Sequence, residues 1–222
     1  MNQRLAFWQQ PEVVAMFAAR EPDHRLAALV ETYQDPPATR VLDLGCAGGR
    51  NTVFLAEGGF DVLACDFSPA MVAETVHRLT PVLGAEEAAR RVRVSPMDDL
   101  SWSGDGAFDL VVALGVYHNA GSGTEWERAL EETARVTSRG ARVLVANFTP
   151  AMSPSGDPLV PVPGETNLYD GFKSGRSYLL DAAGLDAAFA RFGFEPETAT
   201  RLVEKETEKG RRSTVNALYR KR

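Results

Sequence analysis

Cysteine is scarce in this sequence, and long apolar runs are missing. The 222 residues include two cysteines, Cys46 and Cys65, too few for a disulfide framework, and no CxxC pair or Cys/His cluster suggests a metal site. The chain never reaches the roughly 18 consecutive apolar residues of a membrane span, and its first residues lack the apolar stretch of an export signal. The sequence therefore predicts a soluble cytoplasmic protein that holds no metal and does not contact a membrane.

Positive charge is also in short supply. The sequence has 24 Lys and Arg residues against 30 Asp and Glu residues, a formal net charge of -6 at pH 7. Such a chain has no overall positive field to attract phosphate backbones, although the basic stretch at 211–222 shows that a local positive patch can coexist with this total. We therefore expect a small-molecule partner rather than nucleic acid.

Hydrophobic residues make up 44% of the chain, enough to bury one substantial core. Short apolar runs alternate with segments of helical periodicity, and this alternation predicts a parallel sheet with helices on both faces. Two segments near the end alternate apolar and polar residues, which predicts an antiparallel hairpin. The expected strands cover residues 41–44, 61–65, 91–94, 108–114, 141–148, 198–206 and 213–219.

These elements predict a single α/β domain with a Rossmann-like, seven-stranded, mostly parallel sheet. Helical spacing interrupted by Pro11 and Pro22 predicts two short helices before the first strand. A Pro-, Gly- and Ser-rich stretch after the fifth strand is long for a passive connection and typical of a binding loop. The predicted segments of the domain 1–222 are 1–37 (an N-terminal helical segment or lid), 38–148 (the ligand-binding core), 149–178 (a substrate-side loop) and 179–222 (the last helix and the hairpin).

A glycine-rich loop at 43–50 joins the first strand to the following helix. Glycines there let the backbone turn tightly and approach a ligand, at the strand ends where nucleotide-like ligands dock. Asp66 closes the second strand, about twenty residues after the first glycine, where a carboxylate can accept hydrogen bonds from ribose hydroxyls. A tight turn and a solvated acid are the plainer alternatives. The loop and the acid fit either an NAD-type dinucleotide or S-adenosylmethionine.

The glycine positions weaken the dinucleotide interpretation. The fingerprint G-x-G-x-x-G requires glycine at 45, 47 and 50, but Ala47 and Arg50 occupy the last two positions. An NAD-dependent oxidoreductase therefore remains an alternative, as does a non-catalytic partner subunit. A degenerate domain of that second kind tends to lose the ribose acid and the loop glycines, which this chain has.

The segments VLDLGCAGGRNT and VLACDFSPAMV resemble the first two motifs of the class I S-adenosylmethionine-dependent methyltransferases, and FDLVVALGVYH resembles the fourth strand of that family. The resemblance covers roughly 38–148. It implies S-adenosylmethionine as cofactor and methyl transfer to an acceptor by in-line displacement. The run GGRNTVFLAEGGFDV, the long loop and the final hairpin are most similar to the tellurite-resistance-type and related small-molecule methyltransferases.

The resemblance also implies roles for individual residues. Asp43 would order the loop and face the methionine amino group, while Asp66 would hold the ribose. This chain departs from the family at Ala47, where a glycine is usual, and at Pro96, where an acid often precedes the adenine-binding backbone. Asp98 or Asp99 could supply that acid. The residues expected to bind the cofactor are Asp43, Gly45, Cys46, Ala47, Gly49, Asp66, Phe67, Met71, Met97, Asp98, Leu114 and Gly115.

Catalytic and acceptor-binding residues are less strongly indicated. His118, just beyond the fourth strand and next to Tyr117, is the best placed general base if the acceptor is a hydroxyl or a thiol, although local packing or hydrogen bonding is the simpler explanation. Lys173, Arg176 and Tyr178 lie in the long loop, where they are either substrate contacts or part of a solvated connection. As contacts, the two cations would favour an anionic or strongly polar acceptor.

Overall fold

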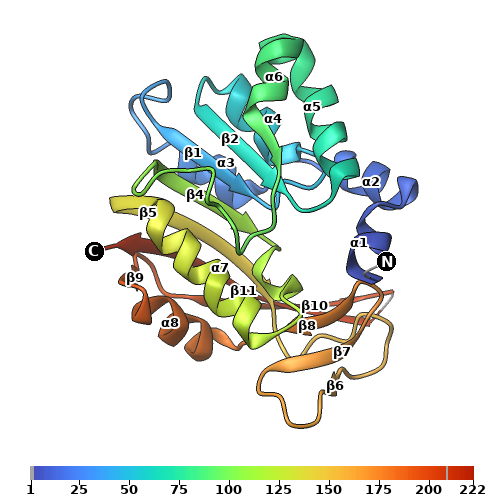
Figure 1. Ribbon diagram of the computed structural model, residues 1–222. Helices are drawn as coiled ribbons and strands as arrows, with labels where there is room; N and C mark the ends of the chain where they lie inside the picture. The colour runs from blue at the N-terminus through green and yellow to red at the C-terminus, as the bar shows by residue number, and fades with distance from the viewer. Residues whose placement is uncertain (1–2, 209) are drawn as a thin grey trace.

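The computed structural model describes residues 3–208 and 210–222 and centres on one sheet (Figure 1). Residues 1, 2 and 209, which fall in the predicted segments 1–37 and 179–222, lie outside the described residues. The sheet has eight strands within the described part of the chain, in the order β10-β11-β5-β4-β1-β2-β3, with β9 paired to β11. The strands are β1 (Arg40–Leu44), β2 (Asp61–Asp66), β3 (Val92–Val94), β4 (Phe108–Leu114), β5 (Thr137–Phe148), β9 (Phe194–Pro196), β10 (Arg201–Thr207) and β11 (Gly210–Lys221).

The order of the strands indicates where a ligand would bind, because it reverses next to β1. Strand β1 pairs in parallel with β2 on one side and with β4 on the other. Strands β3 and β5 extend the parallel sheet outward, and β11 joins β5 antiparallel. Ligands of open α/β sheets bind at the carboxyl ends of the strands beside such a reversal, so the end of β1 is the position to examine.

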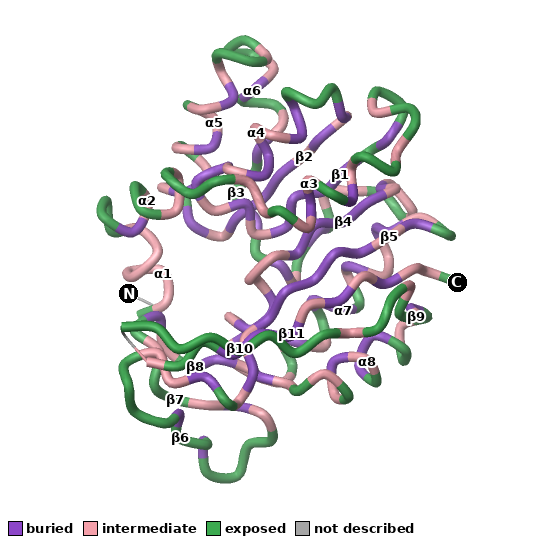
Figure 2. Tube along the Cα trace, turned by 180° about the vertical axis from the view of Figure 1, so that it is seen from behind, coloured by how far each residue is buried: buried purple, intermediate pink, exposed green. Residues whose placement is uncertain are grey.

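Helices cover both faces of the sheet, as its apolar strands require. Successive residues of β1 show the two sides: Val41 packs with α3 (His24–Val30), whereas Leu42 packs with α7 (Gly123–Val136). The first face also carries α4 (Arg50–Glu57), α5 (Pro69–Leu83) and α6 (Ala85–Arg91), and the second carries α8 (Ala182–Arg191). Figure 2 shows buried residues concentrated along β4 and β5, with β10 exposed. The predicted Rossmann-like fold with a C-terminal antiparallel hairpin is confirmed, with eight strands instead of seven.

The N-terminal segment differs from the prediction. It contains three helices, α1 (Gln3–Trp8), α2 (Pro11–Ala18) and α3, where the sequence predicted two. Pro11 occupies the first turn of α2, where its missing N–H costs nothing, and therefore begins a new helix. Asp23 caps α3 by accepting a hydrogen bond from the Arg25 N–H at 3.0 Å. Helix α6 was not predicted either. Its helical spacing is shown by Glu–Arg pairs and not by apolar residues, on which the prediction of helices relied.

Residues 149–178, predicted to be a loop, contain a small antiparallel sheet. It consists of β6 (Val160–Pro161), β7 (Leu168–Phe172) and β8 (Gly175–Tyr178). Met152, Leu159 and Leu179 form its own small apolar cluster. Short strands rich in Gly and Pro give little periodic signal, which is why sequence reasoning missed them. Strand β8 lies against the short helix η1 (Tyr117–Asn119) after β4, so this sheet borders the carboxyl edge of the main sheet.

Candidate functional site

The glycine loop is held in a left-handed turn by the neighbouring strand. The N–H groups of Gly45 and Cys46 both donate to the Cys65 carbonyl, at 2.8 and 3.0 Å. Gly49 is the N-cap residue of α4 and has φ +79°. This left-handed backbone conformation favours glycine. Ala47 also has a positive φ, 49°, which costs an alanine about 1–2 kcal/mol. The usual glycine at this position of the resembling family therefore has a physical reason, and Ala47 retains the same turn.

Asp66 connects this loop to the loop after β2. One carboxylate oxygen accepts the Ala47 N–H at 3.0 Å and the other accepts the Ser68 N–H at 2.9 Å. Burial raises the pKa of Asp66 to about 6, against the opposing effect of these two hydrogen bonds. Because a carboxylate has about four acceptor positions, both oxygens can still accept hydrogen bonds from a ligand.

Asp43 lies near the end of β1 and is the first residue of the glycine loop. Thr52 of α4 donates its hydroxyl to one Asp43 oxygen at 2.6 Å, which fixes the start of the helix against the strand. Burial raises the pKa of Asp43 to about 6 as well. Two buried acids with raised pKa values therefore flank the loop, the pattern expected where ligands bind.

The first two helices cover the glycine loop. Gly48 lies so close to α2 that a Cβ atom there would be 2.6 Å from the Ala18 nitrogen. Ser68 donates its hydroxyl to the Trp8 carbonyl at 3.2 Å, and Arg4 forms an ion pair with Glu125 of α7 at 2.7 Å. Helices α1 and α2 thus run from the β2 side of the site to the α7 side. The sequence suggested a lid here but did not identify these contacts.

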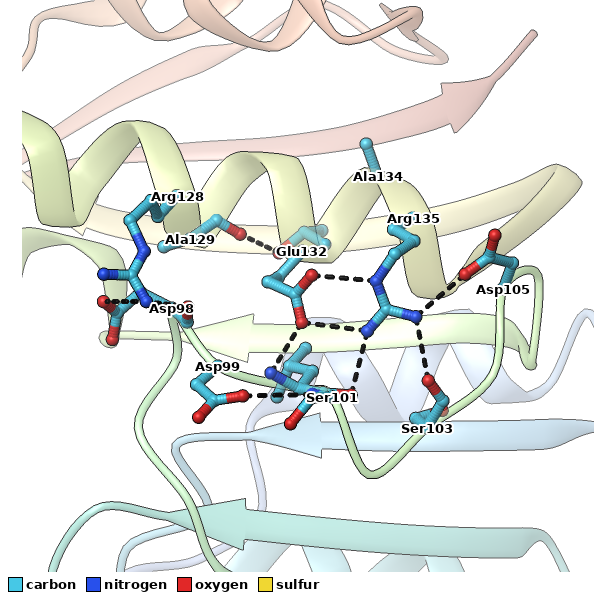
Figure 3. Close-up of polar contacts among 12 residues, drawn as sticks. Asp98, Asp99, Ser101, Ser103, Asp105, Arg128, Ala129, Glu132, Ala134 and Arg135 are labelled. Carbon is cyan, nitrogen blue, oxygen red and sulfur yellow. Dashed lines mark hydrogen bonds and ion pairs between the residues drawn. The ribbon is translucent and has the colours of Figure 1, made fainter.

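The residues expected near an adenine differ in their surroundings. Met71 and Met97 are buried, and Phe67 is half-buried with the Arg4 guanidinium 5.3 Å from its ring centre. Asp98 lies 3.6 Å from Arg128 of α7, whereas Asp99 is exposed and accepts the Ser101 N–H at 3.2 Å (Figure 3). Which of these two acids would contact an adenine stays open.

Two residues of α7 that the sequence did not single out fix the β3–β4 loop (Figure 3). Glu132 accepts the Leu100 N–H at 2.6 Å. Arg135 donates to the carbonyls of Leu100 and Ser103, at 2.9 and 2.8 Å, and pairs with Asp105 at 2.9 Å. Two side chains of α7 therefore hold the loop that follows β3, mainly through its backbone groups.

Tyr117 and His118, the catalytic candidates, point to different places. The Tyr117 ring is fully buried between Trp126 and Phe189, and its hydroxyl lies 2.7 Å from that of Thr133. Tyr117 is therefore part of the core. His118 lies at the carboxyl edge, where its Nδ1 accepts the Phe148 N–H at 3.3 Å and burial lowers its pKa to about 3.

The accepting Nδ1 leaves the proton of a neutral imidazole on Nε2, so His118 presents a hydrogen-bond donor and is poorly suited to act as a base. Its ring centre lies 4.3 Å from that of Phe148. Beside it, Gly115 has φ +93° and accepts a hydrogen bond from the Asn119 amide at 2.9 Å, which closes the turn after Leu114. A positioning role for His118 fits this geometry better than proton transfer.

The three candidates in the 149–178 segment have different surroundings. Tyr178 stacks on Trp126 with ring centres 4.9 Å apart. Arg176 lies 3.4 Å from Asp170, while Lys173 is exposed at the β7–β8 turn. A role for these residues in binding an acceptor stays a prediction.

No group of three or more His, Cys, Asp or Glu residues in 3–208 and 210–222 is placed to hold a metal ion. Over the same residues, no helix is long and apolar enough to cross a membrane.

The segment that forms this geometry is similar to a known family. A family model described as a methyltransferase domain matches residues 41–140, which span β1, the glycine loop, Asp66 and the β3–β4 loop. Over these residues the chain is similar to methyltransferase domains, in agreement with the resemblance of its motifs to the class I S-adenosylmethionine-dependent methyltransferases. The first two motifs of the resemblance are the segments that form the turn and its acid.

Curated methyltransferases are similar to part of this chain. A demethylmenaquinone methyltransferase of Beutenbergia cavernae is 35% identical over 119 residues, 53% of this chain and 45% of the relative. Another from Corynebacterium urealyticum is 30% identical over 168 residues, 76% of this chain and 60% of the relative. The chain thus spans about half the length of the curated relatives it matches. The subgroup predicted from sequence stays a prediction, because these relatives are named for another reaction.

A solved structure of a S-adenosylmethionine-dependent methyltransferase from Methanosarcina mazei has the same fold. Its TM-score is 0.64 at 20% identity, and the alignment covers 87% of this chain and 96% of that one. At this identity the similarity shows only that the two chains share a fold.

Proposed function

We propose that the protein transfers a methyl group from S-adenosylmethionine to a small-molecule acceptor. The observation that carries this proposal is the position of Asp66, whose carboxylate joins the glycine loop to the loop after β2 beside the strand-order reversal. The relatives named for demethylmenaquinone and magnesium-protoporphyrin methylation support a small acceptor.

The residues around the loop fit this cofactor. The Trp8 indole N–H is buried without a hydrogen-bond partner in the described part of the chain and would be a free donor for a polar ligand. The backbone of the same residue is held at the site, because the Trp8 carbonyl accepts the Ser68 hydroxyl. Asp66 would accept hydrogen bonds from the ribose hydroxyls, and Asp43 would face the amino group. Phe67, Met71 and Met97 would provide the apolar faces of an adenine pocket.

Bound S-adenosylmethionine supplies an electrophilic methyl group, so the protein has mainly to align the acceptor and exclude water. Helices α1 and α2 exclude water by closing over the glycine loop through Ala18 and Trp8. His118 and Phe148 border the acceptor side, and His118 can donate a hydrogen bond from Nε2 to an acceptor molecule. A dedicated base is not required by this mechanism.

The affinity for S-adenosylhomocysteine should fall as the pH is lowered through about 6. Burial raises the pKa values of Asp43 and Asp66 to about 6, and only the ionised carboxylate is a pure acceptor for ribose hydroxyls. Below the raised pKa, the affinity should fall by about tenfold per pH unit for each proton that is released when the ligand binds. Calorimetric titrations from about pH 5 to 8 measure this slope. Asp66→Asn should make the slope shallower, and an unchanged slope in that variant would contradict the assignment.

The proposed function is tested by calorimetric titration of the purified protein with S-adenosylmethionine, S-adenosylhomocysteine and NAD. Binding of both adenosyl compounds without binding of NAD is the expected result. A screen of small acceptors would follow. Binding of NAD alone, or of no compound, would refute the proposal.

A further inference from the structure

Two arginines near the acceptor side of the site have no carboxylate partner. Arg20 follows α2, with its guanidinium carbon 3.9 Å from the centre of the Phe17 ring. Arg212 lies near the start of β11, with its guanidinium carbon 5.9 Å from the centre of the Phe148 ring. No carboxylate within residues 3–208 and 210–222 lies at ion-pair distance from either side chain. Within the described residues, each guanidinium group contacts an aromatic ring and pairs with no carboxylate.

The alternation of β11 turns Arg212 toward the N-terminal helices. Residues 212, 214 and 216 share one face of the strand, since successive side chains point to opposite faces. Asn216 on this face accepts a hydrogen bond from Arg25 of α3. Thr214 pairs with Phe148 at the carboxyl end of β5, which makes Phe148 the diagonal neighbour of Arg212. Arg212 thus lies on the face that α3 covers, at the ligand edge of the sheet.

Arg20 approaches the same region from the opposite side. The end of α2 packs on the glycine loop through Ala18 and Gly48, which places Arg20, two residues later, beside this loop. Burial and the positive charges of Arg50 and Arg212 lower the pKa of Arg20. Arg50 differs from the other two because it lies 3.8 Å from Asp23. The uncompensated positive charge therefore belongs to Arg20 and Arg212.

We propose that Arg20 and Arg212 bind an anionic group, a carboxylate or a phosphate, on the methyl acceptor. This inference rests on the proposed function and assigns the substrate class to it. Two neighbouring guanidinium groups repel each other, and an anion placed between them replaces repulsion with charge-assisted hydrogen bonds. Phe148, stacked between His118 and Phe172, lies directly beside Arg212. The anionic acceptor that the sequence placed at Lys173 and Arg176 is thereby assigned to a different pair of cations.

The test uses protein saturated with S-adenosylhomocysteine and titrated with inorganic phosphate at constant ionic strength. Arg212→Gln is expected to weaken phosphate binding by about tenfold, the effect of losing a charge-assisted contact, and Arg20→Gln by a similar factor. Arg211→Gln is the matched control, because Arg211 directly precedes Arg212 in β11, points to the other face and pairs with Glu204 at 2.6 Å. Phosphate affinity in this control should stay within about twofold of wild type.

The outcomes separate three cases. Phosphate binding that is absent in the wild type, or that falls equally in Arg211→Gln and Arg212→Gln, would overturn the proposal. Phosphate that is displaced by S-adenosylhomocysteine, with weaker binding of that compound in the two variants, would mean that the arginines hold the carboxylate of the cofactor and would also overturn it. Failure of the wild type to bind S-adenosylhomocysteine would refute the proposed function and this inference with it.

Discussion

Replacing Asp66 with Ala should weaken the binding of S-adenosylhomocysteine by about tenfold or more, because hydrogen bonds to a charged group contribute roughly 1.5 to 3 kcal/mol. The substitution removes the expected acceptor for the ribose hydroxyls. It also removes the acceptor of the Ala47 and Ser68 N–H groups, which should loosen both loops. Calorimetry measures the change in affinity directly.

Asp61→Ala is the matched control for this variant. Asp61 lies at the opposite end of the same strand, β2, where it pairs with Arg91 at the surface. Its loss should change affinity by less than about twofold, as expected for an exposed ion pair far from the ligand. Equal affinity in wild type and Asp66→Ala would show that Asp66 does not hold the ribose.

Trp126→Ala should lower the free energy of unfolding by about 3–5 kcal/mol, the usual cost of truncating a buried tryptophan. Trp126 is 1% exposed and joins Tyr117 of η1 to Tyr178 of β8. Its removal leaves a cavity at the point where the small sheet meets the main domain. Chemical denaturation measures the change in stability.

Arg128→Ala, in which an exposed residue of the same helix is truncated, provides the comparison for Trp126→Ala. Its effect should stay below about 1 kcal/mol, since surface ion pairs contribute little. If the two variants proved equally stable, the proposed role of Trp126 in anchoring the β6–β8 sheet would be wrong.

The glycine loop and Asp66 were predictable because they depend on local signals. A buried strand, a run of glycines and an acid at the end of the next strand follow one another closely along the chain. The spacing alone places them at one edge of a parallel sheet. The alternation of strands and helices gave the fold for the same reason.

The packing of α1 and α2 over the glycine loop depends on contacts between residues far apart in the sequence, so it could not be predicted. The approach of Ala18 to Gly48 joins residues that no local periodicity relates. In the sequence, Glu132 and Arg135 have the spacing of an ordinary surface ion pair on a helix. Only the structure shows that both side chains also bind the backbone of the β3–β4 loop (Figure 3). Such residues show no sequence signal other than helical charge spacing.

The environment of His118 was also beyond the sequence. The position of His118 after β4 indicated the correct edge of the sheet. Its protonation, however, depends on burial and on the N–H of Phe148 in β5, a strand that is distant in the sequence. Its neighbour Tyr117 points into the core for a simple reason: the short η1 helix turns successive side chains in different directions.

The backbone contact between Ala18 and Gly48 also couples the motion of α2 to that of the glycine loop. Two main-chain segments that touch without intervening side chains restrain each other, so any ligand that orders the glycine loop also slows the opening of α2. Amide hydrogen exchange in α2 therefore becomes a readout of whether the loop is occupied. The N-terminal residues would report the presence of a cofactor through the rate at which their amide protons are lost to solvent.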